Sequence, residues 1–339
     1  ESDREFVGSL GSRFHALPEA SPHYSISEQL RIPLALRHAR VDLFHAPHYV
    51  VPRLVPCPYV VTIHDCIHLR FPQYLPNRFA PVYARTMMRM AGRGARRILT
   101  VSYASKLDIL HYLRIPADRV EVIYNAPDEH ITAPPPLENL TRTRDRYQLT
   151  SPFILYTGNI KPHKNLDRLI DAFGRTSFRS GGGKLVAMGG RPDEHAALSA
   201  RLSPEQREYT EIRPFAGQVE LETMLAACMF VVQPSLEEGF GLPAWEALSC
   251  GIPLCCSDGG SLPEITGEWA DSFPAASTEA MTAALDACAS RAAATGAEQR
   301  DRASDRFLET APSIASHAAE LAGILERALP GRPGVGPVD

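Results

Sequence analysis

The chain has 339 residues, enough for two domains of ordinary size, each with a buried core. Its 44% of hydrophobic and 22% of charged residues are typical of a folded protein and exclude a disordered one. The formal net charge of -4 excludes a general attraction to nucleic acid or to an anionic membrane, so no nucleic-acid partner is expected.

The sequence also bears on where the protein works. No apolar run approaches the roughly 20 residues that span a bilayer, and the opening ESDREFVGSL lacks the layout of a secretory signal. The seven cysteines form no CxxC pair and have no metal-ligand spacing. We therefore expect a cytoplasmic protein without structural zinc.

Short apolar runs alternate with helical patterns along residues 1–130, which is typical of a parallel sheet covered by helices. We interpret this part as an N-terminal domain. Its predicted helices are residues 78–94 and 105–113. Its predicted strands are residues 5–7, 41–44, 59–63, 97–101 and 120–123.

The pattern breaks at residues 131–137, ITAPPPL. Its three consecutive prolines have no backbone N–H groups, so the segment cannot continue a helix or a central strand. We therefore predict that residues 131–150 hold the interdomain linker and the start of a second domain.

The alternation resumes in residues 151–310, the predicted second domain. Its predicted strands are residues 153–156, 184–188, 211–213, 229–233 and 252–256, with helices at 165–173, 221–227 and 243–248. Residues 297–329 read as one long helical segment, so residues 311–339 are expected to form a C-terminal helix and a loose tail. The expected fold class is α/β, with two doubly wound domains facing each other across a cleft.

Residues 231–248, VVQPSLEEGFGLPAWEAL, combine the end of a buried strand, a loop and the start of a helix. Pro243 suits the first turn of a helix, and Gly239 and Gly241 let the backbone approach an anion without a Cβ in the way. In open parallel sheets, ligands bind where strand carboxyl ends meet helix N-termini, whose N–H groups favour phosphate. The segment therefore predicts a phosphate site.

Two carboxylates frame this loop: Glu238 precedes the glycines and Glu246 lies about one turn into the helix. A carboxylate only accepts hydrogen bonds, so it suits hydroxyl groups. A diphosphate flanked by hydroxyl-rich rings satisfies both kinds of group, and a nucleotide sugar is such a ligand. The plainer interpretation is two solvated surface carboxylates near a helix start.

A second motif, GNIKPHKN, begins at Gly158 after a predicted strand. Lys161 and Lys164 make the loop basic, and Asn165 is expected to cap the next helix, which buries one apolar face. The two lysines are therefore expected at the same sheet edge as Gly239. Their ammonium groups there would neutralise a departing nucleoside diphosphate.

These segments resemble the retaining family 4 glycosyltransferases, which have the two-domain GT-B fold. The resemblance covers residues 41 to about 273. The Glu-x7-Glu motif of that family matches Glu238 and Glu246, and its diphosphate-binding loop matches GNIKPHKN. The other matching segments are VVTIHD (60–65), ILTVS (98–102) with Ser105-Lys106, VIYN (122–125) and SDGGSLPE (257–264).

The resemblance implies a role for each matching residue. Glu246 would bind the ribose hydroxyls and Glu238 the transferred sugar, while Lys164, helped by Lys161 or Asn159, would stabilise the leaving phosphate. The implied donor-binding residues are Gly158, Asn159, Lys161, Lys164, Val219, Glu238, Gly239, Phe240, Gly241, Leu242 and Glu246. Val219 belongs to FAGQV, which resembles the loop that lies against the nucleobase.

The implied catalytic residues are Glu238, Lys164 and His64, with His64 lining the cleft from the first, acceptor-side domain. His45, His48 and His68 lack a family match and are expected to be structural or to shape the acceptor site.

Two features depart from the family pattern. Members usually begin with a strand and a glycine-rich loop, whereas this chain opens, without a Met, on what resembles the second strand. The N-terminal domain is therefore expected to lack its first strand-helix unit. In addition, Asn159 stands where many members have Arg, so one positive charge is missing at the diphosphate or is supplied by Lys161.

The resemblance implies a metal-independent transferase that moves a hexose from a nucleoside diphosphate to an acceptor hydroxyl with retention. No cofactor is expected besides the nucleotide-sugar co-substrate. The TGNxxPHKN variant resembles members that use GDP-mannose, so we expect mannosyl transfer to a saccharide or lipid-linked saccharide, with a UDP-sugar as the alternative donor. A non-catalytic nucleotide-sugar-binding protein is another alternative, and an epimerase or phosphorylase on the same fold has less support.

A row of arginines lies in residues 78–97: Arg78, Arg85, Arg89, Arg93, Arg96 and Arg97. Four of them share one side of the predicted helix. Such a row is either a solvated face or a contact for lipid phosphates. Peripheral contact with the inner face of the membrane is therefore kept as an alternative.

Overall fold

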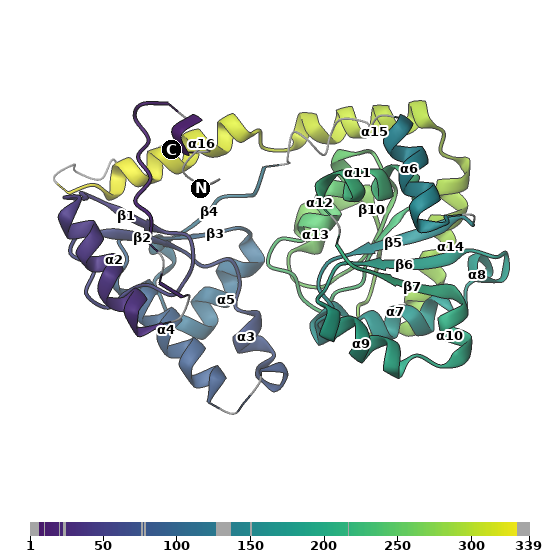
Figure 1. Cartoon of the computed structure of the whole chain (residues 1–339), viewed down its shortest axis with the longest axis horizontal. Helices are drawn as coiled ribbons and strands as arrows, with labels where there is room; N and C mark the ends of the chain where they lie inside the picture. Colours follow the sequence, from purple (N-terminus) through teal and green to yellow (C-terminus); the bar gives the residue numbers. More distant parts are fainter. Residues whose placement is uncertain are drawn as a thin grey trace.

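The computed structural model describes residues 7–9, 11–19, 21–22, 25–75, 77, 79–126, 137–149, 151–215 and 217–330. Within these residues the chain forms two α/β domains that lie side by side (Figure 1). Each domain is built on a sheet whose recorded strand pairs are all parallel. This arrangement confirms the predicted fold class.

The first domain has a four-stranded sheet in the order β1-β2-β3-β4. Its strands are β1 (Phe44–Ala46), β2 (Tyr59–Thr62), β3 (Arg97–Thr100) and β4 (Val120–Val122). Its helices and 3-10 turns are α2 (Ile26–His38), α3 (Ile67–Arg70), η1 (Pro72–Tyr74), α4 (Ala80–Gly94), α5 (Tyr103–Leu113) and η2 (Ala117–Arg119). Val60, Val61 and Ile98 have no exposed surface, as expected for parallel strands covered on both faces.

The first domain differs from the sequence prediction in several places. The strand predicted at 41–44 is β1 at Phe44–Ala46, and α3 was not predicted. Residues 5 and 6 of the predicted first strand lie outside the described part, and Val7 is helical. Helix α2 was not predicted, although Ser25 caps it by accepting from Glu28 N at 3.1 Å. Its apolar residues include exposed ones such as Leu30, so the burial pattern that predicts a helix is weak.

The second domain has a six-stranded sheet in the order β10-β9-β8-β5-β6-β7. Its strands are β5 (Phe153–Thr157), β6 (Lys184–Met188), β7 (Thr210–Arg213), β8 (Val231–Gln233), β9 (Leu254–Ser257) and β10 (Ala270–Phe273). The other elements are α6 (Leu137–Tyr147), η3 (Pro162–Lys164), α7 (Leu166–Phe173), α8 (Ser177–Ser180), α9 (Pro192–Arg201), α10 (Pro204–Tyr209), α11 (Gln218–Ala227), α12 (Leu242–Ser249), α13 (Leu262–Thr266), η4 (Gly267–Trp269), α14 (Thr278–Ala294) and α15 (Ala297–Thr310). Helix α16 (Ile314–Ala328) follows them in the chain. Strand β10 was not predicted.

Residues 131–136 of the predicted linker lie outside the described residues. The description resumes at residue 137 with α6, which packs beside α11. The helical segment predicted at 297–329 is two helices, α15 and α16. Residues 311–313 separate them. Pro312 has no N–H to donate and disfavours a helical conformation in the residue before it, so one continuous helix was the wrong prediction.

Helix α16 returns from the second domain to the first, where it lies over the sheet (Figure 1). Ile324 and Ala328 are buried in a cluster with Val60, Leu99 and Ile123. Helix α16 therefore packs on the first domain, although it follows the second domain in the sequence. Because α16 follows α15 of the second domain, this apolar contact helps to hold the two domains in their relative position.

Candidate functional site

Two loops meet where the strand order of the second sheet reverses. β5 pairs with β6 on one side and with β8 on the other, so the loops after β5 and β8 begin at adjacent carboxyl ends. Ligands bind at this point in open α/β sheets. Leu236 N donates to the His163 carbonyl at 2.7 Å and joins the two loops.

Asn165 stands at the N-cap position of α7, but its side chain links the loops instead of capping the helix. Its φ is 63° and its side chain makes no capping hydrogen bond. Nδ2 donates to the carbonyls of Pro234 at 3.0 Å and Ala275 at 2.9 Å. The predicted side-chain cap is therefore wrong, because the amide satisfies buried carbonyls of neighbouring loops.

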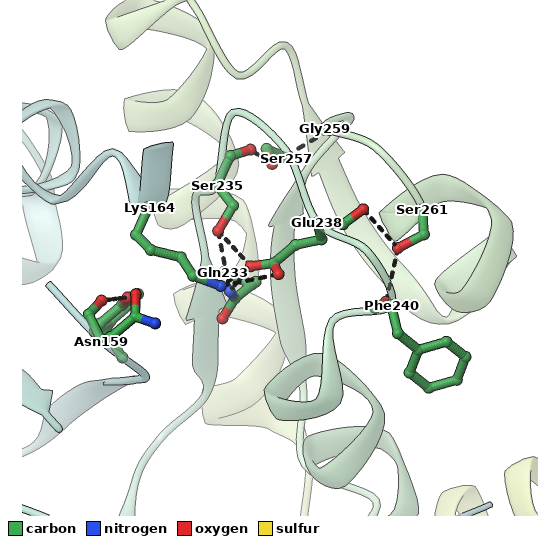
Figure 2. A network of polar contacts seen from close by, with 10 residues as sticks. Asn159, Lys164, Gln233, Ser235, Glu238, Phe240, Ser257, Gly259 and Ser261 are labelled. Carbon is green, nitrogen blue, oxygen red and sulfur yellow. Dashed lines mark hydrogen bonds and ion pairs between the residues drawn. The ribbon is translucent and has the colours of Figure 1, made fainter. Parts of the chain in front are cut away.

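Glu238 and Lys164 form a buried ion pair between these loops (Figure 2). Lys164 Nζ lies 2.7 Å from Oε1 and 2.9 Å from Oε2 of Glu238. Gln233 Nε2 and Ser235 Oγ each donate to Oε1 at 2.6 Å. Only 6% of Glu238 is exposed, so these donors replace the water that a carboxylate needs.

The two carboxylate oxygens of Glu238 are unequally used. Oε1 accepts from Lys164, Gln233 and Ser235, whereas Oε2 accepts from Lys164 alone among the described residues. A carboxylate has about four acceptor sites over its two oxygens. Oε2 can therefore accept one more hydrogen bond, such as one from a ligand hydroxyl.

The SDGGSLPE segment braces the loop that carries Glu238 (Figure 2). Ser261 Oγ donates to the carbonyls of Glu238 at 3.2 Å and Phe240 at 2.8 Å. A Cβ at Gly260 would collide with the Glu238 carbonyl, and Gly260 has a φ of 60°. Only glycine tolerates both conditions without strain.

Gly239 lies where the two domains touch. Ser102 Oγ and Ser105 Oγ donate to its carbonyl at 2.6 and 3.1 Å. A Cβ at this position would lie 2.9 Å from Asp65 Cβ and 3.1 Å from the His64 carbonyl. The absence of a side chain therefore lets the loop that carries Glu238 reach the first domain.

Glu264, at the end of the same SDGGSLPE segment, caps helix α5 of the first domain. The backbone N–H groups of Tyr103 and Ala104 donate to it at 2.7 and 3.0 Å, and the Tyr124 hydroxyl donates at 2.7 Å. A carboxylate is favourable at a helix N-terminus. This contact holds the two walls of the cleft together.

A cavity of about 590 Å³ lies in the cleft between the domains. This volume is within the range of small-molecule sites. The predicted site residues that line it are His64, Asn159, Lys161, Lys164, Glu238, Gly239, Phe240, Gly241 and Leu242. On the first-domain side it is also lined by Phe71, Tyr74 and Leu75.

Three predicted donor-binding residues do not line this cavity: Gly158, Val219 and Glu246. Gly158 directly follows the last residue of β5. Its φ is 142°, and its N–H donates to the Met188 carbonyl at 3.0 Å. Val219 is exposed in the first turn of α11. Glu246 is half-buried in α12. Their contacts with a donor stay predictions.

Lys161 lines the cavity but pairs with Glu194 at 3.1 Å. The lysine side chain is 43% exposed, and such exposed pairs are worth about 1 kcal/mol or less. A diphosphate can therefore displace Glu194 from this lysine.

Glu237 was not predicted, although it directly precedes Glu238. It is buried and pairs across the domains with Arg70, whose Nε lies 2.9 Å from its Oε2. Burial raises the pKa of Glu237 to about 7, against the opposing effect of Arg70. In the sequence, only its position next to Glu238 pointed to this residue.

His163 is a second residue that the prediction missed, although it stands inside GNIKPHKN and lines the cavity. Burial, followed by the charge of Lys164, lowers the pKa of His163 to about 4. Its ring is therefore neutral at physiological pH, and it adds no positive charge beside the lysines.

Some arginines of the predicted row contact other parts of the chain, and others are exposed. Arg96 donates to the Ala328 carbonyl of α16 at 3.0 Å, and Arg97 pairs with Glu121 of β4. Arg85 and Arg93 are exposed on α4. Arg78 lies outside the described residues.

Other features bear on cofactors and location. Among the residues that the structure describes, no group of three or more His, Cys, Asp or Glu side chains is placed to hold a metal ion. In the same part of the chain, every helix is too short or too polar to span a membrane. The seven cysteines form no disulfide.

The sequence matches known families and proteins. Residues 2–130 match Glycosyltransferase Family 4 and residues 141–306 match Glycosyl transferases group 1. O-antigen chain mannosyltransferase B of Escherichia coli is 31% identical over 251 residues, which are 72% of this chain and 64% of that protein. O-antigen chain mannosyltransferase RfbU of Salmonella typhimurium is 26% identical over 239 residues, which are 69% of this chain and 61% of that protein. The chain thus spans less than two thirds of the length of these relatives.

The fold also resembles solved structures. Anabaena Alr3699/HepE in complex with UDP-glucose superimposes with a TM-score of 0.74 over 91% of this chain and 85% of that chain. The two sequences are 16% identical. At this identity the likeness concerns the fold alone.

We predict that Glu237 makes the folded state less stable as the pH rises. Its pKa of about 7 in the folded protein exceeds the ordinary value of 4.5, so the folded state binds the proton more tightly than the unfolded chain. This stabilisation is complete below about pH 4.5 and is lost by about pH 7, a change of about 3 kcal/mol.

Urea unfolding at about pH 5 and about pH 8 measures this change in the free energy of unfolding. Glu237→Gln should remove most of it, while Glu205→Gln, at an exposed position, should leave it. An unaltered pH dependence in Glu237→Gln would contradict the assignment.

Proposed function

We propose that this chain, which belongs to the family 4 and group 1 glycosyltransferases, transfers a hexose from a nucleoside diphosphate sugar to an acceptor hydroxyl with retention. The buried Lys164–Glu238 pair inside the cleft cavity carries the proposal. An ammonium group suits a phosphate, and a carboxylate suits a sugar hydroxyl. The pair therefore marks the place of the bond between sugar and phosphate.

In the proposed reaction, the bond between the anomeric carbon and the leaving phosphate oxygen breaks. The acceptor oxygen forms a bond to the same carbon on the same face, and its proton passes to the leaving phosphate oxygen. Lys164 gives two N–H groups to Glu238, so its third N–H stabilises the negative charge that grows on the phosphate. Oε2 of Glu238 accepts from a hydroxyl of the transferred sugar.

Mannose is the proposed sugar. Both relatives described above are named mannosyltransferases, and the TGNxxPHKN variant at residues 157–165 resembles members that use GDP-mannose. A UDP-sugar is the alternative donor, because HepE shares this fold and its structure contains UDP-glucose.

A non-catalytic nucleotide-sugar-binding protein is the second candidate. The Lys164–Glu238 pair supports this candidate as well, since a protein that only binds a nucleotide sugar would use the same two groups. Incubation with a panel of GDP-, UDP- and dTDP-sugars, with release of the nucleotide measured, separates the two. If the protein binds a donor but releases nucleotide from none of the panel, the proposed enzymatic activity is refuted.

The acceptor is proposed to be a saccharide, free or linked to a lipid at an anionic membrane. Tyr74 lines the cleft cavity and is 41% exposed, and Val82 and Tyr83 of the nearby α4 are exposed as well. Arg85 and Arg93 lie on the same helix. Apolar and basic side chains together suit an anionic lipid surface next to the cavity.

We predict that GDP or UDP binds without a divalent metal and that Lys164→Ala weakens this binding about 10- to 100-fold. The mutation removes a charge-assisted contact to phosphate, worth about 1.5–3 kcal/mol. Calorimetry in EDTA measures the affinity, and Lys184→Ala, at the amino end of β6, is the control. A requirement for magnesium, or indifference to Lys164, would count against the site.

We predict different defects for the two motif carboxylates. Glu246→Gln should raise the Michaelis constant for the donor and weaken the free nucleotide, because ribose binding is the same in ground and transition states. Glu238→Gln should lower turnover by about 10²-fold, on the order of 3 kcal/mol, and leave the free nucleotide bound. Calorimetry and a transfer assay on both variants decide this. If both variants lose nucleotide affinity equally and keep normal turnover, the two carboxylates do not have the different roles proposed here.

We predict that Arg85→Glu/Arg93→Glu weakens binding to phosphatidylglycerol vesicles about tenfold or more, since each basic residue near such a surface contributes about 1 kcal/mol. Co-sedimentation measures the bound fraction, with pure phosphatidylcholine vesicles for comparison. Arg201→Glu/Arg302→Glu makes the same charge change in the second domain and should bind like the wild type. Equal binding by both double variants would rule out α4 as the contact.

A further inference from the structure

A small chamber adjoins the cleft cavity inside the first domain. It has a volume of about 180 Å³ and lies between the sheet and α16. Thr62 and Thr100, the last residues of β2 and β3, line it together with His45, Asn125 and His317. Asn125 lines the cleft cavity as well, so the two spaces are neighbours.

The lining of this chamber is mostly apolar, with a few polar side chains and no carboxylate, ammonium or guanidinium group. Its residues include imidazoles, hydroxyls, an amide and apolar groups, and none of them is Lys, Arg, Asp or Glu. A phosphate or carboxylate would find no opposite charge here. A neutral ligand with hydroxyls and apolar faces, such as a sugar ring, matches this lining.

Backbone carbonyls determine which nitrogen of two histidines carries the proton. His64 Nε2 lies 3.1 Å from the Pro47 carbonyl, and His317 Nδ1 lies 2.8 Å from the Tyr124 carbonyl. A carbonyl only accepts, so these nitrogens are the donors. In a neutral imidazole the other nitrogen is an acceptor. Both rings line the chamber and can receive ligand hydroxyls.

Thr100 gives an independent indication of a ligand. Its side chain has no exposed surface, and its Oγ1 has no hydrogen-bond partner among the described residues. The neighbouring Thr62 hydroxyl, by contrast, is bonded to His45 Nε2 at 2.9 Å. A buried polar group without a partner is unfavourable, and a ligand hydroxyl in the chamber would satisfy it.

We propose that this chamber binds the acceptor sugar ring that carries the attacking hydroxyl. The proposal rests on the proposed function, because it needs a glycosyl acceptor. Thr100 and His317 hold the ring, and His64, which lines both spaces, lies where the ring meets the donor. The acceptor therefore ends in one uncharged sugar, and α16 contributes to its binding.

The test uses the methyl α-glycosides of mannose, glucose and galactose as probes, with binding measured by saturation-transfer NMR. At least one probe should bind the wild type. Thr100→Val removes the hydroxyl at nearly constant volume and should weaken binding at least fivefold, as should His317→Leu, while Thr100→Ser should keep it. Thr210→Val removes a buried, unpartnered hydroxyl in the second domain and should have no effect.

Donor hydrolysis by water separates failure of this proposal from failure of the proposed function. If hydrolysis proceeds but no probe binds, or if Thr100→Val and His317→Leu both bind like the wild type, the chamber is not the acceptor site. If the substitutions abolish probe binding but no nucleotide sugar is ever turned over, the chamber binds a sugar and the transferase function fails.

Discussion

The buried ion pair between Lys164 and Glu238 is the interaction on which the ligand edge of the second domain depends. Removing one partner of such a pair leaves a buried charge and typically costs about 3–5 kcal/mol. The pair is stable here because Gln233 and Ser235, at the end of β8, add two donors. The loops after β5 and β8 are thereby held together before any ligand arrives, with one carboxylate oxygen and one N–H still available. Such preorganisation is what stabilisation of a developing charge requires.

The same loop is held from the first domain. Gly239 accepts from two serines of the first domain, and Glu264 caps α5. Both contacts come from segments at the carboxyl edge of the second sheet, so the second-domain wall of the cleft takes its position partly from the first domain. The SDGGSLPE segment serves both purposes, since Ser261 braces the Glu238 loop and Glu264 reaches across.

The cleft cavity and the chamber beside it differ in charge. Lys161, Lys164 and two adjacent glutamates face the cavity or lie beside it on the second domain. The chamber in the first domain has no charged lining residue. This contrast suits the proposed anionic donor and the proposed uncharged acceptor sugar. The burial that raises the pKa of Glu237 also reduces the negative charge that the phosphate of such a donor would meet.

The sequence by itself determined the two parallel sheets and the edge at which the site lies. Strands such as β6 are continuous apolar runs, and the carboxyl ends of parallel strands share one edge, so Lys164 and Glu238 could be placed together from their positions in the chain. Only the tertiary structure decided that they pair, that Asn165 bonds to Pro234 and Ala275, and that His317 joins Thr100 in one chamber. Hydrophobic periodicity reports which face of an element is buried, but it carries no information about which distant residue fills the space opposite.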